Sequence, residues 1–443
     1  MRKFSRETFW DGVLATMVII SLFLSAKLWF PSTGNEGIEV KGTSIQEIPP
    51  SSYAAMPVIH RPERILVRRS DGKMALFMTS STSYEALRLL VGRIINDLTQ
   101  PVWVADPPTP TDGSFITLHM PFPLTFDEIA DEWAWDGLSG HGSGFRVDQI
   151  TVNLNEGGST WLLGPAAGGY RLDGMASADR QELLAALNGL KEADLKPYRL
   201  LKAVEGVALR SPVWVPDVDG IQELSTVVTT PVRAEVEARF FPDLSVVRQI
   251  DEQGAVSLTD GQRLLRISDE GILDFNLAGG SRETGTPVSQ MEVIRRWVEE
   301  NGGWPRDVVQ TRTTTQGGRS LYQFELRLVA AYPVESNGGA LQIQLTGNQV
   351  LSFRRYPDVA GIRPGPNQLS IRTPEQALLV AAREQPLLSL TPIRDAYLSY
   401  QLEPGDGLRP WVVEPTWVFR MGEARVLVPA RPDQTNRRVN LVR

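Results

Sequence analysis

Cysteine is absent from the 443 residues of this chain, and histidine is scarce, with only His60, His119 and His141. The lack of cysteine excludes disulfides, thiolate-bound zinc, iron–sulfur clusters and a cysteine nucleophile. Neither a Gly-x-Ser-x-Gly elbow nor a His-Glu-x-x-His pair occurs, and no carboxylate stands at ligand spacing from His60 or His119 on a shared face. The sequence therefore predicts a protein that is not an enzyme and has no metal or cofactor.

An excess of basic residues is also lacking. Lys and Arg number 45 against 52 Asp and Glu, so the net charge is −7, which argues against nucleic acid as a partner. Hydrophobic residues make up 42% and charged residues 22% of the chain, as in ordinary globular proteins. The length allows several domains of about 100–200 residues each.

One long apolar run is present near the N-terminus. Residues 13–30 (Val13–Phe30) carry a single charge, Lys27 near the end, and such a run has the length of a membrane-spanning helix. Basic residues Arg2, Lys3 and Arg6 precede it. The positive-inside tendency then predicts a single-pass protein of the cell membrane, with residues 1–12 in the cytoplasm and the bulk of the chain outside.

A cleaved signal peptide is the alternative for such a segment. The stretch around Ala26 has Leu24 where a small residue would favour cleavage, and Trp29 suits an interfacial anchor, so a retained transmembrane helix is favoured. Residues 31–57 are rich in Ser, Gly, Pro and Glu and are expected to form a linker.

A stripe of residues on the apolar helix is a candidate partner-binding site. Leu14, Val18, Ser21 and Ser25 fall on one helical face, and the two serines form a small-xxx-small pair that lets a neighbouring helix approach closely. The alternative is that these serines face lipid by chance.

For the part of the chain after the membrane helix, the sequence predicts an α+β fold. Residues 58–235 are expected to form a first domain, which opens with a hairpin around Asp71-Gly72. Its expected helices are Tyr84–Leu98, Thr125–Trp135 and Ser177–Leu190, and its further strands are Phe115–Met120, Arg146–Leu154, Thr160–Leu163 and Tyr170–Leu172.

The remaining chain contains a four-stranded meander over 245–275 and then a repeated order of elements. Thr286-Pro287 and Thr373-Pro374, 87 positions apart (286 and 373), each have the sequence of a helix start, and three expected strands follow each helix. We expect two similar helix-plus-antiparallel-sheet modules joined by the Pro/Gly-rich segment 357–366. They belong to a middle domain, 236–365, and a C-terminal one, 366–443, although chance similarity is an alternative in a chain with 31 prolines.

Several residue clusters admit a chemical interpretation but favour a structural one. Asp127, Glu128, Asp131 and Glu132 could seat a cation, yet Thr125 and Glu128 have capping-box spacing. The loop 140–144 lacks the lysine of a phosphate-binding loop. Four tryptophans near the repeats fit a core better than a binding surface: Trp297, Trp304, Trp411 and Trp417. A basic C-terminal end (Arg431, Arg437, Arg438, Arg443) fits a solvated tail, or attraction to an anionic cell-surface polymer.

Three segments resemble the YycH family, the membrane-anchored regulators of the YycG (WalK) sensor kinase of Gram-positive bacteria. They are Phe240–Ile250, Leu258–Arg266 and the tryptophan-rich Pro410–Phe419. The order of elements from anchor to C-terminus is similar as well. The first exported domain and the linker match least.

The resemblance implies one transmembrane helix and three extracytoplasmic domains, of which the last two are alike. It further implies a regulator that, with a YycI-like anchored protein, modulates the kinase and thereby cell-wall homeostasis through protein contacts of the membrane helices. Proteins of the family are not enzymes, and the resemblance supplies no catalytic residues. The alternatives are a peptide- or polymer-binding module and a cell-wall-acting enzyme.

Overall fold

The computed structural model describes residues 61–443 with several gaps. Its gaps are residues 79–80, 99, 108–109, 134–143, 166–167, 193–194, 211, 280–286, 306–307, 330–331, 337–338, 390, 405–410, 423, 434–438 and 443. The segments expected to be the transmembrane helix (13–30) and the linker (31–57) lie outside the described residues.

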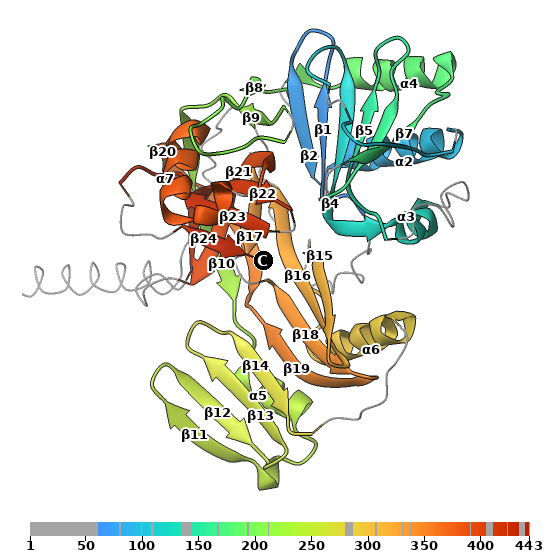
Figure 1. The fold of residues 1–443 in the computed structure, drawn as a ribbon. Helices are drawn as coiled ribbons and strands as arrows, with labels where there is room; N and C mark the ends of the chain where they lie inside the picture. The colour runs from blue at the N-terminus through green and yellow to red at the C-terminus, as the bar shows by residue number, and fades with distance from the viewer. Residues whose placement is uncertain are drawn as a thin grey trace, which may run out of the picture. The chain divides into compact units, whose positions relative to one another are not determined.

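The first part is an antiparallel sheet with helices packed on one face (Figure 1). Within the described residues the strand order is β2-β1-β4-β5-β6-β7-β3. The strands are β1 (Arg64–Arg68), β2 (Met74–Met78), β3 (Val102–Val104), β4 (Phe115–Thr125), β5 (Arg146–Asn153), β6 (Thr160–Leu163) and β7 (Gly169–Leu172), and the helices are α2 (Thr82–Asn96), α3 (Phe126–Trp133) and α4 (Ser177–Asn188). The expected hairpin, helices and strands are confirmed, with ends shifted by a few residues.

The alternation of side chains along β1 explains why this sheet has two different faces. Ile65 and Val67 lie in the core beneath the helices, whereas Leu66 belongs to a separate apolar cluster on the opposite face. Since successive side chains of a strand point to opposite faces, Arg64 and Arg68 lie on the side of Leu66. The sheet therefore presents arginines on the face without helices.

The second part is a long sheet built mostly from antiparallel pairs. Within the described residues its path is β11-β12-β13-β14-β19-β18-β16-β17-β21-β22-β23-β24, with β15 beside β16. Its strands are β11 (Arg248–Glu252), β12 (Ala255–Thr259), β13 (Arg263–Ser268), β14 (Leu273–Leu277), β15 (Val308–Gln316), β16 (Arg319–Val329), β17 (Pro333–Ser336), β18 (Leu341–Thr346), β19 (Gln349–Arg355), β21 (Ile393–Pro404), β22 (Trp411–Met421), β23 (Ala424–Pro429) and β24 (Asn440–Val442). The remaining elements outside the two large sheets are β8 (Tyr198–Leu200), β9 (Trp214–Pro216), β10 (Gly220–Thr229), β20 (Asp358–Ser370), α5 (Arg233–Phe240), α6 (Pro287–Glu300), α7 (Pro374–Glu384), η3 (Leu244–Val246) and η4 (Pro386–Ser389).

The repeated order of elements appears in this second part. Helix α6 precedes the neighbouring strands β16, β18 and β19, and α7 precedes the neighbouring strands β21, β22 and β23. Thr373 caps α7 as expected: its hydroxyl accepts from the Gln376 amide at 3.2 Å, and the Gln376 side chain accepts from the Thr373 amide at 3.0 Å. Thr286 lies outside the described residues. The α+β class with mostly antiparallel sheets is confirmed.

The Pro/Gly-rich segment 357–366 differs from its expected role as a plain connection. It forms most of β20, which pairs antiparallel with β10 in a two-stranded ribbon. Proline is tolerated here because each strand of such a ribbon has an outer edge that needs no N–H donor. The register shifts between Gln222 and Leu224, opposite the prolines Pro364 and Pro366.

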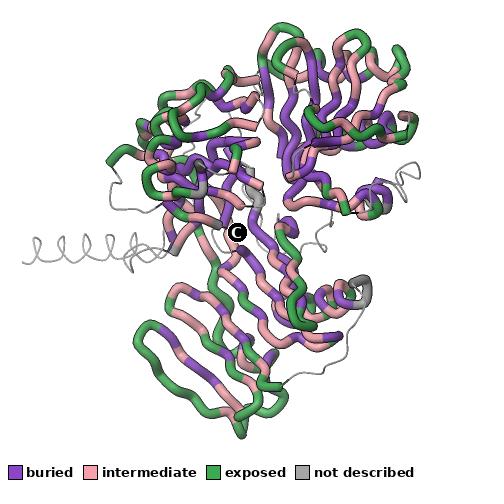
Figure 2. The backbone as a smooth tube through the Cα atoms, viewed as in Figure 1, coloured by how far each residue is buried: buried purple, intermediate pink, exposed green. Residues whose placement is uncertain are grey.

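Burial divides the described chain into two main cores (Figure 2). The first contains residues between Ile65 and Leu187, and the second contains residues between Leu201 and Val439. By contrast, β11 is exposed along its whole length. The expected division into domains at 235 and 365 remains a prediction.

Candidate functional site

The partner-binding residues expected from the sequence, Leu14, Val18, Ser21 and Ser25, lie outside the described residues. None of the helices within the described part of the chain is long and apolar enough to cross a bilayer.

One member of the acidic cluster on α3, Glu128, takes part in helix capping, while the side chains of Asp131 and Glu132 lie outside the described residues. The Thr125 amide donates to Glu128 Oε2 at 2.7 Å, and the Glu128 amide donates to Thr125 Oγ1 at 3.2 Å. This is the capping box that the spacing predicts, and it occupies the Glu128 carboxylate. Asp127 is exposed beside it. No cluster of three or more potential metal ligands occurs among the described residues.

The tryptophans near the repeats are core residues. Trp417 is fully buried and donates its indole N–H to the Arg372 carbonyl at 2.9 Å. Trp304 is buried against Phe324, and the half-buried Trp297 packs on Phe275. These side chains therefore stabilise the fold instead of forming a binding surface.

A buried group of charged side chains joins the first sheet to the second. Arg64 on β1 and His119 on β4 are directly paired across the first sheet, on the face without helices. Asp395 on β21 and Arg420 on β22 are paired in the same way in the second sheet. All four side chains are buried, so two polar strand pairs meet inside the protein.

Ion pairs connect the two strand pairs. Arg64 forms an ion pair with Asp395, and its guanidinium lies 4.0 Å from the centre of the Tyr397 ring. Arg420 forms an ion pair with Glu63 at 3.0 Å and also donates to the carbonyl of Pro121 at 3.0 Å. A further buried ion pair links Arg394 on β21 with Asp148 on β5. We call Glu63, Arg64, His119, Asp148, Arg394, Asp395 and Arg420 the ionic junction.

The electrostatics of the ionic junction fix its charge state. Burial, followed by the charge of Arg64, lowers the pKa of His119 to about 3. Burial, the largest single effect, would raise the pKa of Asp395, but the charges of its buried neighbours, Arg64 first among them, and the hydrogen bond from Arg64 together outweigh burial and hold that pKa below its usual range. Asp395 therefore remains ionised at neutral pH while His119 is neutral, and His119 Nδ1 lies 3.4 Å from the Arg64 guanidinium as an acceptor.

The ionic junction could not be predicted from the sequence, because its members come from distant segments. His119 and Asp395 are 276 positions apart (119 and 395), so no local spacing links them. One signal was available: Leu66 stands between Arg64 and Arg68, on the face opposite to Ile65 and Val67, and an apolar residue on that face indicates that it is partly covered.

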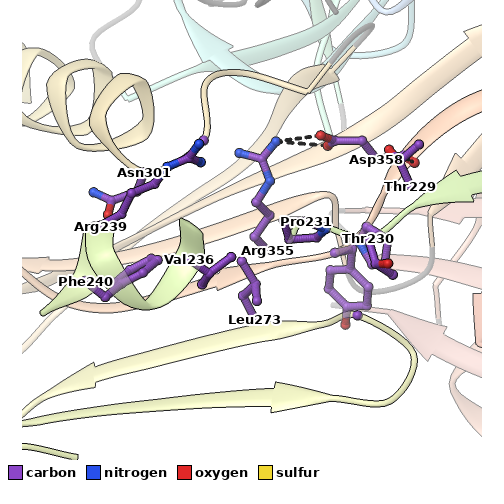
Figure 3. A pocket seen from close by; sticks show the side chains of 14 residues that line it. Thr229, Thr230, Pro231, Val236, Arg239, Phe240, Leu273, Asn301, Arg355 and Asp358 are labelled. Carbon is purple, nitrogen blue, oxygen red and sulfur yellow. Dashed lines mark hydrogen bonds and ion pairs between the residues drawn. The ribbon is translucent and has the colours of Figure 1, made fainter. Parts of the chain in front are cut away.

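A small pocket of about 130 Å³ lies where α5 and the end of α6 meet the ends of β10 and β19 (Figure 3). Arg355 donates to the Gly303 carbonyl at 2.6 Å and makes two hydrogen bonds to Asp358, at 3.0 and 2.8 Å. A Cβ at Gly302 would lie 3.1 Å from Arg355 Nη1 and 3.4 Å from Arg239 Nη1, and φ of Gly302 is +118°. Arg355 thus connects the end of α6 to the start of β20, and Asp358 balances its charge, so this pocket has a structural role.

Comparison with solved structures identifies the fold. The crystal structure of YycH from Bacillus subtilis matches with a TM-score of 0.53 at 14% sequence identity, over 86% of this chain and 98% of YycH. The chain has the fold of YycH. The match covers nearly all of the YycH chain, so the YycH likeness expected from the sequence segments is confirmed at the level of the fold.

Two further solved structures match less extensively than YycH. An uncharacterized protein from Eubacterium rectale has a TM-score of 0.31 at 10% identity, over 59% of this chain and 93% of its own. The YpeB C-terminal domain from Bacillus megaterium has a TM-score of 0.27 at 10% identity, over 49% of this chain and 100% of its own. No protein-family model and no curated protein matches the sequence.

Beside the ionic junction, this YycH-like fold contains a cleft of about 650 Å³. Its walls come from β4 and β5 of the first sheet and from β15, β16, β21, β22 and β23 of the second. The cleft is lined by five arginines, namely Arg146, Arg312, Arg394, Arg420 and Arg425.

Proposed function

We propose that this chain is a membrane-anchored, extracytoplasmic regulator of a sensor histidine kinase of the YycG (WalK) type, which acts by protein–protein contact. The observation that carries the proposal is the YycH fold over 86% of this chain. The apolar run at residues 13–30, preceded by basic residues, supports the membrane anchor. A YycI-like anchored protein is the second proposed partner, and cell-wall homeostasis is the proposed process.

The fold suits a regulator that passes a change in the placement of its sheets to a partner protein, and it does not suit an enzyme. The ionic junction connects two sheets through buried, mutually balanced charges, and it contains no nucleophile next to a base. His119 is held neutral inside this group, which removes it from acid–base work near neutral pH.

Contact through the membrane helix is the proposed route to the kinase. Ser21 and Ser25 offer small side chains and hydroxyls to a neighbouring helix, on the face that Leu14 and Val18 extend. We expect three extracytoplasmic domains to hold this helix in place from outside, with boundaries near residues 235 and 365.

Co-purification from membranes tests the proposal. The intact chain should bring down the sensor kinase, and Ser21→Leu with Ser25→Leu should weaken that association because added bulk separates the helices. The matched control is Thr16→Leu with Ala26→Leu, which adds comparable bulk on another face of the same helix and should leave association intact. Absence of the kinase from the wild-type eluate would contradict the proposed function, and equal behaviour of the two double variants would contradict the proposed contact face.

A further inference from the structure

The arginine-lined cleft has the dimensions of a small-molecule site. Its volume of about 650 Å³ falls within the range of 300–1,000 Å³ that is usual for ligand pockets. Three segments that are distant in sequence form it, because β4 and β5, β15 and β16, and β21–β23 each supply part of the wall. A bound ligand would therefore touch both large sheets at once.

The charge of the cleft is opposite to that of the protein. Five arginines line it together with two acidic residues, Asp148 and Glu325, whereas the whole chain has a net charge of −7. Five arginines against two acidic residues give the lining an excess of positive charge on an acidic protein. Such a local field attracts anions and repels cations.

The inner arginines are held in fixed positions by acidic partners. Arg394 forms an ion pair with Asp148, and Arg425 forms an ion pair with Glu325. The Arg420 guanidinium pairs with Glu63. These contacts orient guanidinium groups along the cleft wall before any ligand arrives, which lowers the entropic cost of binding.

The outer arginines come from different sheets. Arg146 begins β5, is exposed, and makes no ion pair with any described residue. Arg312 on β15 is also exposed and donates to Thr314 Oγ1 at 3.0 Å. Thr311, Thr313 and Thr315 of the same strand also line the cleft.

We propose that this cleft binds a small molecule that carries phosphate groups. Guanidinium groups form paired hydrogen bonds with phosphate oxygens, and hydroxyl groups add single donors around the same oxygens. Donors from two sheets around one cleft match a group with several oxygens in a tetrahedral arrangement better than one planar carboxylate. The proposal goes beyond the proposed function, because it concerns a ligand and does not depend on a kinase.

Calorimetry on the purified full-length chain tests this site with inorganic pyrophosphate and with glycerol 1-phosphate as probes. Saturable binding of at least one probe is expected. Arg146→Gln removes a charged donor from an exposed position, so the protein should fold normally and bind about tenfold more weakly. Adding Arg312→Gln should weaken binding further.

A matched control separates this site from general charge effects. Arg296→Gln removes another exposed arginine, on α6 and outside the cleft, and should leave binding unchanged. The proposal is overturned if neither probe binds saturably, or if Arg146→Gln and Arg296→Gln bind alike. Tighter binding of hexaglutamate than of both phosphate probes would also overturn it, in favour of an acidic peptide.

Discussion

The protein contains two junctions between its parts, and they are built differently. Where the first sheet meets the second, the contact depends on buried charges, and no described strand of one sheet pairs with a strand of the other. Where the α6 module meets the α7 module, β17 pairs in parallel with β21, and one apolar core extends across both modules. Backbone hydrogen bonds and apolar burial are insensitive to pH, whereas ion pairs are not.

This difference indicates which boundary is adjustable. A buried ion pair contributes little net stability compared with a well-packed apolar contact, but the loss of one partner is costly. The ionic junction is therefore the place where a change of charge alters the contact between the sheets. We call the contact between the α6 and α7 modules, through β17 and β21, the strand junction. It should open only together with the modules that it joins.

The largest expected effect comes from removing one charge of the ionic junction. Asp395→Asn leaves Arg64 and Arg420 buried with only Glu63 to balance them, and we expect a loss of about 3–5 kcal/mol. Hydrogen exchange measures this loss: the amides of β4 report on the ionic junction, and the amides of β18 report on the sheet that contains β17 and β21.

Two further variants control for this effect. Asp395→Leu combined with Arg64→Met replaces both charges by apolar side chains and should recover much of the stability. Glu292→Gln breaks an exposed ion pair with Arg295 on α6 and should change the stability little, because solvent screens such pairs. A loss from Asp395→Asn no larger than that from Glu292→Gln would mean that the charges do not hold the sheets together.

Acid should loosen the ionic junction before the strand junction. The pKa of His119 falls from about 6.5 in the unfolded chain to about 3 in the folded one, so the unfolded state binds the extra proton. Stability from His119 is thus present above pH 6.5 and decreases as the pH falls toward 3. At pH 5 the expected loss is about 2 kcal/mol, and Asp395, whose pKa is also lowered, adds its loss only below about pH 4.

Hydrogen exchange at pH 7 and pH 5, corrected for intrinsic rates, checks this dependence. Amides of β4 should exchange about 30-fold faster at pH 5 relative to pH 7, while β18 amides change little. In His119→Gln the difference should largely disappear. Equal acid sensitivity of β4 and β18 would contradict the contrast between the junctions.

A smaller effect is expected far from both junctions. Thr373→Ala removes the hydroxyl that accepts from the Gln376 amide at the start of α7, at a cost of about 1 kcal/mol. Thermal unfolding should register this loss, with no change in the acid response of β4. If Thr286 caps α6 as Thr373 caps α7, Thr286→Ala should lower the stability by a similar amount. An unchanged stability in Thr286→Ala would argue against a cap at Thr286.

The sequence predicts local structure well because local structure depends on local patterns. The hairpin at Asp71-Gly72 is marked by its turn residues and α2 by the spacing of its apolar residues. The Thr373 cap is marked by the proline that follows it, and the Thr125 cap by Glu128 three positions later. The resemblance of short segments to the YycH family also predicted the fold that the solved structure of YycH confirms.

The parts that the sequence did not predict depend on distant residues. Strand β20 was missed because its prolines and glycines mark a connection unless the partner strand β10 is known. The ionic junction and the arginine-lined cleft were missed because Arg64, Asp395 and Arg420 are brought together only by the tertiary fold. Charged residues at such separations carry no periodic signal.

The proposed role in kinase regulation is tested most directly by the phosphorylation of the response regulator that the sensor kinase serves. We predict that deleting this chain changes the phosphorylated fraction in cells, and that the full-length chain restores it. A version exported without residues 1–46 should not restore it, because the membrane helix is the proposed contact. An unchanged phosphorylated fraction in the deletion strain would contradict the proposed function.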